Sequence, residues 1–501
     1  MTASAQAYRG ATATLCLGPL RNLTEALQRC RRLLEQGLRF VELRDDLLTD
    51  QELTQCAHAL PREQTLLSLR RPRTDQVALV DLLAPALLDV ACELGEMPPA
   101  LAAKIANSLP LKLFRSCHTR TDQESVSALL DRLTAEIPEP QIIKVAIPIA
   151  NLAELRDGHR WRLQNPQRHI FLPIASDGSG RFRFYRLLTA NQQLLHFLRD
   201  LDSPLVPDQP APAEWTSRQQ IPIPNTAPIP FAAILGNPVE HSRTPEYHAQ
   251  FFARYGMPVL KVRITDEDLR SCDVLSVLRD LGLRAAAVTS PLKTWLRESI
   301  VAMGGAWEVI DAQDPQDAGN TMVVHHNGNV IGCSTDGTGL RASWRDTLRD
   351  QSGVLGAIPN LAVFGGGGLL SLLQSVFPSA LFLSARTGKV RTSQPELLLP
   401  DHPPNISAVI WSVGRSRYRN APPPWLRPQL VFDLNYSADS PGREFAQAVG
   451  AQYVDGSRFF EYQAAAQQQF WRRHLPPVHP ETEQNPLMIS AGGNPATRNQ
   501  P

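Results

Sequence analysis

"LAVFGGGGLLSLLQSVFPSALFLSARTGK" occupies residues 361–389, and its layout predicts the fold of the second half of this chain. An apolar strand over 361–364 leads into four glycines, then an apolar helix, and then a second strand that ends in "SART". Strand, glycine turn and helix in this order are typical of a Rossmann-type dinucleotide-binding turn. Because glycine runs after strands also form ordinary tight turns, the motif alone leaves both interpretations open.

Length, charge and cysteine usage restrict the class of protein. A chain of 501 residues is too long for one hydrophobic core, since domains usually stop growing at about 250 residues. The formal charge of +1 argues against nucleic acid or an anionic membrane as the main partner. The seven cysteines include no Cys-x-x-Cys pair, so neither a disulfide framework nor a metal site is predicted. With no signal peptide and no 18-residue apolar run, we expect a cytoplasmic protein without a membrane partner.

Proline content predicts how the chain divides. Residues 202–231 carry the densest proline run, and because proline fixes φ and removes a donor, we expect a stiff, extended connector there. The tail has few large apolar side chains and is predicted to be disordered. The predicted divisions are a first unit over 1–203, a linker over 204–230, two domains over 231–335 and 336–475, and a tail over 476–501.

The first half alternates between strand-like and helix-like segments. Eight short apolar runs recur along it, and helix-period segments separate several of them. This alternation predicts a parallel sheet, and eight units predict a (β/α)8 barrel, whose chemistry lies at the carboxyl ends of the strands. Polar groups at the predicted strand ends are Glu42, Arg44, Arg70, His118, Lys144 and Arg186.

Lys144 is the most informative of these side chains, because its neighbours Ile142, Ile143 and Val145 are apolar. Desolvation among apolar groups disfavours an ammonium, and a neutral amine is suited to Schiff-base formation with a ketone. His118, at a neighbouring strand end, would then be the general acid and base. On the pattern alone the alternative stays open that Lys144 extends from an edge strand and that His118 is an ordinary strand-end histidine.

Residues 12–210 resemble the type I 3-dehydroquinate dehydratases in three motifs: "VELR" at 41–44, "SCH" at 116–118 and "IKVA" at 143–146. The resemblance implies that Lys144 forms an imine with 3-dehydroquinate and that His118 moves the protons as water is lost. It also assigns substrate contacts to Glu42, Arg44, Arg70, Arg186 and Gln209, with Arg186 at the substrate carboxylate. The chain departs from the family at Leu205, where serine is usual, and Arg181 or Arg183 is the alternative to Arg186.

Three motifs of the second half resemble the shikimate dehydrogenases: "GNPVEHSRTP" at 236–245, "VTSPLK" at 288–293, and "GNT" with "STDGTG" between 319 and 339. The resemblance implies that Ser242 and Thr244 hold the substrate carboxylate, although on its own Ser-x-Thr is also a helix N-cap signal. It makes Lys293 and Asp336 the catalytic pair, which shuttles the alcohol proton while a nicotinamide carries the hydride. Thr289 and Asn320 are implied as further substrate contacts.

The same family resemblance extends to the cofactor. It implies that Gly365, Gly367 and Gly368 approach the pyrophosphate at a helix N-terminus, and that Arg386 and Thr387 of "SART" meet a 2′-phosphate. The strand end lacks an acidic residue, which agrees with NADP over NAD. Tyr436 in "FDLNYS" and Gln463 in the last helical segment are implied as substrate or nicotinamide contacts. The chain departs from the family at Ala287, Leu369 and Ala385.

Together the two resemblances predict a bifunctional enzyme of the shikimate pathway, in which the dehydratase product is the ketone that the dehydrogenase reduces. Its partners would be small-molecule substrates only; no oligomeric state follows from the sequence. One alternative is that a single half is active, as a dehydratase or as a dehydrogenase of quinate or a related acid. Another is a metabolite-binding regulator, which predicts lost catalytic residues, whereas Lys144, His118, Lys293 and Asp336 are all present. Channeling between the halves stays a hypothesis.

Overall fold

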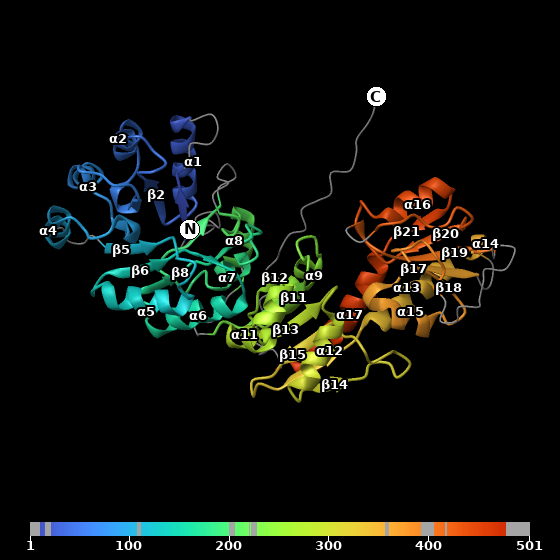
Figure 1. The fold of residues 1–501 in the computed structure, drawn as a ribbon. Helices are drawn as coiled ribbons and strands as arrows, with labels where there is room; N and C mark the ends of the chain where they lie inside the picture. The colour runs from blue at the N-terminus through green and yellow to red at the C-terminus, as the bar shows by residue number, and fades with distance from the viewer. Residues whose placement is uncertain are drawn as a thin grey trace, which may run out of the picture.

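The computed structural model describes residues 11–15, 22–107, 112–199, 206–219, 221, 228–355, 360–391, 405–415 and 418–476. The chain forms three units in sequence order (Figure 1). We name them the N-terminal unit (11–219), the middle lobe (228–333) and the C-terminal lobe (336–454). Leu205 and the predicted tail beyond residue 476 lie outside the described residues. Among the helices of the described ranges, none is long and apolar enough to cross a membrane.

The N-terminal unit is built on one eight-stranded sheet in which all paired neighbours are parallel, in the order β10-β1-β2-β3-β4-β5-β6-β8. The eight apolar runs that the sequence predicts as strands all lie in it. Because the strands are parallel, their carboxyl ends meet at one edge. The strands are β1 (Thr12–Thr14), β2 (Phe40–Arg44), β3 (Thr65–Leu69), β4 (Leu87–Ala91), β5 (Lys112–Cys117), β6 (Ile142–Val145), β8 (His169–Phe171) and β10 (Phe197–Leu198).

Helices follow most of these strands and cover the sheet with their apolar faces. They begin where side chains cap them, as where Thr49 and Glu52 form a capping box at α2 and Asn151 accepts the Glu154 N–H at α6. The helices are α1 (Leu23–Glu35), α2 (Asp50–Ala59), α3 (Gln76–Leu83), α4 (Pro99–Asn107), α5 (Val126–Glu136), α6 (Leu152–Gln164), α7 (Arg183–Leu188) and α8 (Pro212–Gln219).

The edge of the sheet at β6 and β8 is extended by two short strands. β7 (Pro148–Ile149) continues from β6 and β9 (Ile174–Ala175) from β8, and the two pair in parallel. Asp208 fixes this extension, because its carboxylate accepts the N–H groups of Ala175 and Phe182, each at 2.8 Å. The segments after β6 and β8 are thus held to each other beyond the main sheet.

Residues 212–219 of the predicted extended connector form a helix, α8. Pro212 begins the helix, where its missing N–H costs nothing, and Trp215 on the same helix is completely buried. Trp215 packs against His196, with ring centroids 5.6 Å apart, and joins the core of the N-terminal unit. The unit therefore continues past the predicted boundary at 203, and burial of one aromatic side chain overrides the proline-rich composition.

The middle lobe contains a mixed sheet in the order β12-β11-β13-β15-β16-β14, where β15 runs antiparallel to both of its neighbours. Its strands are β11 (Phe231–Gly236), β12 (Val259–Arg263), β13 (Leu283–Val288), β14 (Ala306–Glu308), β15 (Thr321–Val324) and β16 (Val330–Cys333). Its helices are α9 (Thr244–Ala253), α10 (Asp266–Ser271), α11 (Val274–Asp280) and α12 (Lys293–Ala302).

The C-terminal lobe has the Rossmann-type layout predicted from the glycine run: a five-stranded, all-parallel sheet in the order β18-β17-β19-β20-β21. Its strands are β17 (Leu361–Gly365), β18 (Leu381–Leu383), β19 (Ala408–Ser412), β20 (Leu430–Asp433) and β21 (Gln452–Val454). Its helices are α13 (Asp336–Asp350), α14 (Ser352–Leu355), α15 (Leu370–Val376) and α16 (Pro441–Val449).

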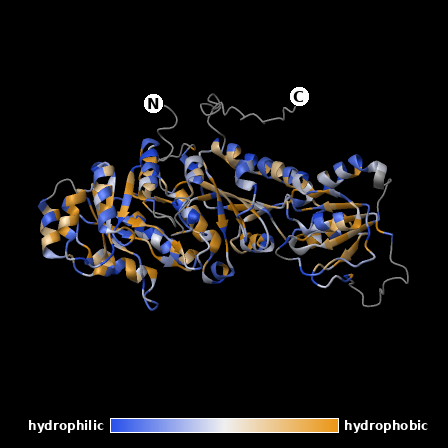
Figure 2. Cartoon of the chain, turned by 90° about the horizontal axis from the view of Figure 1, so that it is seen from above, coloured by the Kyte–Doolittle hydropathy of each residue, from blue (hydrophilic) through white to orange (hydrophobic). Residues whose placement is uncertain are grey.

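The last helix, α17 (Ser457–His474), runs from the C-terminal lobe back to the middle lobe (Figure 1). It packs along α13, and its far end buries Phe470 and Trp471 in the core of the middle lobe. The Trp471 indole donates to the Met322 carbonyl at 3.0 Å. Figure 2 shows hydrophobic residues concentrated on the strands inside the units and hydrophilic residues on the outer helices.

Candidate active sites

A cluster of buried polar side chains lies on the strands of the N-terminal unit. Glu42 on β2 accepts hydrogen bonds from Thr14 at 2.5 Å and from Ser68 at 2.7 Å. Lys144 on β6 donates to Asp89 on β4, and both side chains are about 1% exposed. Side chains from five strands of the sheet, β1, β2, β3, β4 and β6, thus face one interior region.

Opposite charges within this cluster stabilise each other. Burial raises the pKa of Glu42, but the positive charges of Arg70, Lys144 and Arg44 and the Thr14 hydrogen bond outweigh it and leave the pKa below its usual range. Burial likewise raises the pKa of Asp89, and the charges of Lys144, Arg70 and His118 lower it further than burial raises it. Both carboxyl groups are therefore ionised at neutral pH, and they attract the positively charged side chains that lie around them.

The expectation that Lys144 lies alone among apolar groups is corrected by this arrangement. Ile143 and Val145, its direct neighbours on β6, face away, while its amine lies between the Asp89 carboxylate and the Phe197 ring, with Nζ 5.3 Å from the ring centroid. Alternation along a strand sends successive side chains to opposite faces, so apolar neighbours in sequence do not make the lysine's surroundings apolar. Lys144 is held at a fixed place with an acceptor for its proton.

His118 follows β5 and is oriented by Glu93, whose carboxylate lies 3.5 Å from Nδ1 and accepts the His118 and Thr119 N–H groups at 2.6 and 3.0 Å. The other ring nitrogen, Nε2, is buried and has no hydrogen-bond partner among the described residues. Burial lowers the pKa of His118 below its usual range, against the Glu93 hydrogen bond that raises it. The imidazole is thus neutral near pH 7 and keeps one nitrogen free to accept a proton.

The remaining predicted residues of this unit lie in different settings. Arg44 forms an ion pair with Asp46, with Nη2 2.6 Å from Oδ2. Arg70 Nη2 lies 3.6 Å from Glu42 Oε1. Arg186 is buried on α7 and donates to the carbonyls of Leu172 and Pro173 at the end of β8; burial lowers its pKa to about 10. Gln209 is half-buried in the turn before α8.

The two alternatives to Arg186 are occupied by other contacts. Arg181 is bound to Asp268 of the middle lobe, so it is not available for a substrate carboxylate. Arg183 donates to the Pro207 carbonyl at 2.6 Å and lies 3.3 Å from Glu214. Of the three arginines in "GRFRFYR", Arg186 is the one whose guanidinium lies at the carboxyl end of a strand of the eight-stranded sheet.

A cleft of about 740 Å³ separates the middle lobe from the C-terminal lobe. The sequence-predicted residues that line it come from both lobes and from α17, and they are Ser242, Thr244, Thr289, Lys293, Gly365, Gly367, Gly368, Arg386, Tyr436 and Gln463. Asn320, Asp336 and Thr387 are the predicted residues of this half that are not among its lining. Segments far apart in sequence are therefore brought to one cavity.

Lys293 and Asp336 form an ion pair at the wall of the cleft. Lys293 Nζ lies 2.9 and 2.7 Å from the two Asp336 oxygens, and each residue begins a helix, α12 and α13 respectively. Asn320 holds the carboxylate from behind by donating to it at 3.0 Å, and Gln467 of α17 donates to the Asn320 carbonyl at 3.1 Å. Asn320 is thus a residue that fixes the pair rather than one that lines the cleft.

The two hydroxyls at 242 and 244 lie at the start of α9. The Ser242 hydroxyl donates to Thr244 Oγ1 at 3.1 Å and accepts the Thr244 N–H at 3.3 Å. Arg243 occupies the N-cap position of α9 and no side chain makes the capping hydrogen bond there, so the N-cap interpretation of Ser-x-Thr does not hold; both hydroxyl residues line the cleft. Arg243 between them reaches across the cleft to Tyr436, with its guanidinium carbon 5.1 Å from the ring centroid.

The glycine turn at the start of the C-terminal lobe needs glycine for its shape. Gly365, Gly366 and Gly367 have φ values of 101°, 121° and 50°, a region in which side chains are strained, and a Cβ at Gly365 would lie 2.9 Å from the Ser412 carbonyl oxygen. No Cβ at Gly367 or Gly368 would meet an atom within 4 Å, so open space adjoins the turn. The turn thus leaves a cradle at the cleft.

Two positively charged side chains lie where the glycine turn opens to the cleft. Arg386 is exposed and lines the cleft, and so does Arg391, which the sequence reasoning did not single out. Ala287, Leu369 and Ala385, the departures from the family pattern, also line the cleft, so three side chains with no hydrogen-bonding group stand there. Thr387 is exposed beside Arg386.

Several residues of both sites were missed by sequence reasoning. In the N-terminal unit they are Asp89, in the middle of β4, and Glu93, just after it; the strand-end rule used for the other strands was sufficient to find Glu93 only. In the cleft they are Asn237, His241, Arg391 and Asn435. Among the described residues, no group of three or more His, Cys, Asp or Glu side chains could hold a metal ion.

With this geometry in view, residues 234–302 match the family model of the shikimate dehydrogenase substrate binding domain. Two relatives each match about half of this chain: the NADP(+) shikimate dehydrogenase of Paracoccus denitrificans is 29% identical over 284 residues, 52% of this chain and 95% of the relative. The NADP(+) shikimate dehydrogenase of Cereibacter sphaeroides is 28% identical over 284 residues, which cover 51% of this chain and 95% of that relative.

One solved structure is similar along almost the whole chain. It is that of dehydroquinate dehydratase and shikimate dehydrogenase from S. pombe AroM, which is 18% identical, covers 95% of this chain and 98% of that chain, and has a TM-score of 0.33.

Proposed function

We propose that this protein catalyses two successive reactions, the dehydration of 3-dehydroquinate in the N-terminal unit and the NADPH-dependent reduction of the resulting 3-dehydroshikimate in the cleft of the second half. The observation that carries the proposal is the Lys293–Asp336 pair on the wall of a cleft that the matched substrate binding domain shares with a glycine turn. The dehydratase half rests on the Lys144 cluster and on the motifs around it.

For the N-terminal unit we propose a closed (β/α)8 barrel. One apolar cluster joins residues from strands at both ends of the sheet order, including Ile170 of β8 and Phe197 of β10. The Lys144 ammonium on β6 also lies over the ring of Phe197 on β10. In an open eight-stranded sheet such strands would be far apart, so these contacts support a sheet that curls until its ends meet. The polar cluster then lies inside the barrel.

The dehydration follows from the positions of Lys144 and His118. After the ammonium loses its proton, the amine adds to the substrate ketone and water leaves, which forms an imine. The imine withdraws electrons from the adjacent carbon, and His118, neutral and with Nε2 free, takes the proton from it. His118 then returns a proton to the departing hydroxyl, and water releases the product from Lys144. Arg186 would hold the substrate carboxylate.

The reduction follows from the Lys293–Asp336 pair. Lys293 donates a hydrogen bond to the ketone oxygen and supplies the proton as the alcohol forms, and Asp336 holds that ammonium in place. Ser242 and Thr244 would bind the substrate carboxylate, and Thr289, Tyr436 and Gln463 would contact the rest of the ring. The residues around the glycine turn fit NADP, which supplies the hydride. The backbone N–H groups of Gly365, Gly367 and Gly368 would bind its pyrophosphate, and Arg386 and Thr387 its 2′-phosphate.

Cofactor choice is tested with Arg386→Ala. Loss of one charged donor to a phosphate weakens binding by about 10- to 100-fold, the scale of a hydrogen bond to a charged group. We expect the KM for NADP to rise by that factor while the KM for NAD changes less than threefold. Arg391→Ala is the matched variant at the same opening and is expected to show a smaller rise. An equal loss with both cofactors would mean that Arg386 does not distinguish them.

The proposed function as a whole is tested in one coupled assay. Purified protein receives 3-dehydroquinate and NADPH, and the enone absorbance of 3-dehydroshikimate is followed together with loss of NADPH. We expect NADPH to be consumed from dehydroquinate without any added enzyme. Accumulation of the enone with no loss of NADPH would leave the dehydratase and refute the second activity, and no change in either signal with dehydroquinate, but NADPH loss with 3-dehydroshikimate, would refute the first.

A further inference from the structure

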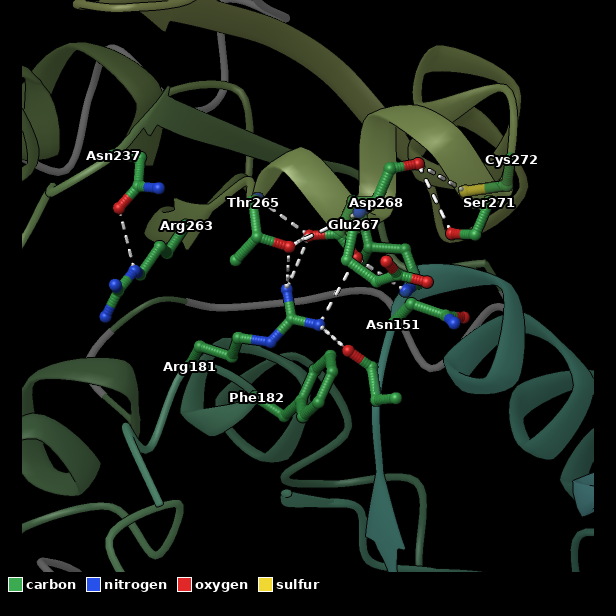
Figure 3. Close-up of polar contacts among 12 residues, drawn as sticks. Asn151, Arg181, Phe182, Asn237, Arg263, Thr265, Glu267, Asp268, Ser271 and Cys272 are labelled. Carbon is green, nitrogen blue, oxygen red and sulfur yellow. Dashed lines mark hydrogen bonds and ion pairs between the residues drawn. The ribbon is translucent and has the colours of Figure 1, made fainter. Parts of the chain in front are cut away.

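One carboxylate of the middle lobe, Asp268, lies at the centre of the contact with the N-terminal unit (Figure 3). It is completely buried in the first turn of α10. Arg181 donates to it through Nη1 at 2.5 Å and Nη2 at 3.3 Å, and the Leu152 N–H donates at 2.8 Å. Thr265 donates through its N–H and its hydroxyl, each at 2.8 Å. Asp268 therefore binds two groups from the other unit besides capping its own helix.

These two groups belong to the segments that extend the sheet edge at β6 and β8. Leu152 is the first residue of α6, where backbone N–H groups have no partner within the helix, and Asp268 supplies one. It follows Lys144 by only eight residues. Arg181 lies after β9, and its Nη2 also donates to the Ala150 carbonyl at 2.5 Å. Arg181 and Asp268 together thus join segment 146–152 to segment 174–182.

The contact excludes water, which makes these bonds strong. The Arg181 and Asp268 side chains are 2% and 0% exposed, and the Arg181 guanidinium stacks on the Phe182 ring at 4.4 Å. α6 packs against α10 and α11, and one apolar cluster includes Leu155 of α6 and Leu278 of α11. Separating the two side chains would leave a buried charge unpaired, which costs much free energy. Arg181 and Asp268 are therefore held in this geometry.

We propose that Asp268 is a positioning residue for the dehydratase site, so that the dehydrogenase half forms part of the support of the dehydratase half. The proposal rests on the dehydratase function proposed above. Asp268 fixes the segment that leads on from Lys144 and the segment that follows β8, whose carboxyl end is where Arg186 lies. Both segments leave the edge of the sheet at which barrel chemistry takes place. Their order thus depends on a side chain that is contributed from outside the barrel.

The test compares full-length Asp268→Asn with Asp280→Asn. Asp280 belongs to the same contact, 2.7 Å from Arg160, but the two side chains are 59% and 32% exposed and the pair is expected to contribute little. For Asp268→Asn we expect hydrogen exchange at least tenfold faster in segments 146–152 and 174–182, and a dehydratase kcat lowered about tenfold. Reduction of supplied 3-dehydroshikimate keeps its wild-type kcat. Asp280→Asn is expected to leave all three measurements unchanged.

A second variant covers the case in which Asp268→Asn fails to fold. Arg181→Met combined with Asp268→Leu leaves no unpaired buried charge, and apolar replacements of buried ion pairs are tolerated. It still lacks the acceptor for the Leu152 N–H, so we expect the same loss of dehydratase kcat with the reductase intact.

The outcomes separate this inference from the proposed function. Full dehydratase activity in the double variant, or unchanged exchange in both segments of Asp268→Asn, overturns the positioning role. A role limited to capping α10 would leave segments 146–152 and 174–182 protected and the dehydratase kcat unchanged, which also contradicts the proposal. A wild-type chain that dehydrates no 3-dehydroquinate instead refutes the dehydratase function itself.

Discussion

Lys144→Ala is expected to lower the dehydration of 3-dehydroquinate by on the order of 10⁴-fold or more, because the variant has no amine to form the imine. Reduction with borohydride in the presence of substrate should add the mass of the reduced ligand to the wild-type chain and nothing to the variant. Intact-mass spectrometry and the rise of the enone signal measure the two effects. The residual rate would reflect binding and proton transfer alone.

Folding has to be separated from chemistry in this variant, since removal of Lys144 leaves Asp89 buried without its ion-pair partner. Lys144→Arg is the matched variant, because it keeps a positive charge beside Asp89 and cannot form an imine. We expect it to lose dehydration and borohydride trapping while it reduces supplied 3-dehydroshikimate at the wild-type rate. Trapping in either variant would show that another amine forms the intermediate.

Asp336→Asn is expected to lower the oxidation of shikimate by about 10² to 10⁴-fold in kcat, the range of general acid–base catalysis. The amide keeps the shape of the carboxylate and can still accept from Asn320, but it no longer holds the Lys293 ammonium 2.7 Å away. Because the residue does not line the cleft, the KM for shikimate should change less than the kcat. Lys293→Ala should lose at least as much.

Asp311→Asn serves as the control, because Asp311, in the loop after β14, pairs with Arg341 of α13 at 2.7 Å and has no contact with Lys293. Its kcat is expected to stay within twofold of wild type. Dehydration of 3-dehydroquinate should be unchanged in all of these variants. An Asp336→Asn enzyme with wild-type kcat would mean that Lys293 needs no carboxylate to transfer the proton.

Local sequence pattern was sufficient for much of the fold. Apolar runs identified the eight strands of the N-terminal unit because each strand is short, buried and bounded by polar segments, and the glycine run identified β17 and its turn because only glycine adopts those φ values. The prediction of an extended linker failed because of a tertiary contact. Nothing local in "PAEWTSRQ" tells that Trp215 has a buried place beside His196, and that burial is what makes the segment a helix of the N-terminal unit.

In the two candidate sites, too, local sequence pattern predicted some features, and tertiary contacts decided the others. Motif order placed Lys293, Thr289 and Gly365 correctly at one cleft, since each motif ends a strand that faces it. The surroundings of Lys144 were predicted wrongly, because they depend on Asp89, which is 55 residues away and on another strand. The alternative in which Arg181 binds the substrate carboxylate failed for the same reason, since its partner Asp268 lies 87 residues away in the other half. Partners that are distant in sequence leave no periodic signal.

The path of α17 has a consequence for synthesis of the chain on the ribosome. The core of the middle lobe needs Phe470 and Trp471, although the strands of that lobe end at Cys333. The strands and helices of the N-terminal unit are complete when residue 219 has emerged, so this unit can fold while translation continues. The middle lobe has to wait for about 140 further residues, and until then its apolar surface is open to chaperones and to aggregation. We therefore expect stop codons before residue 470 to yield chains that are insoluble rather than merely inactive.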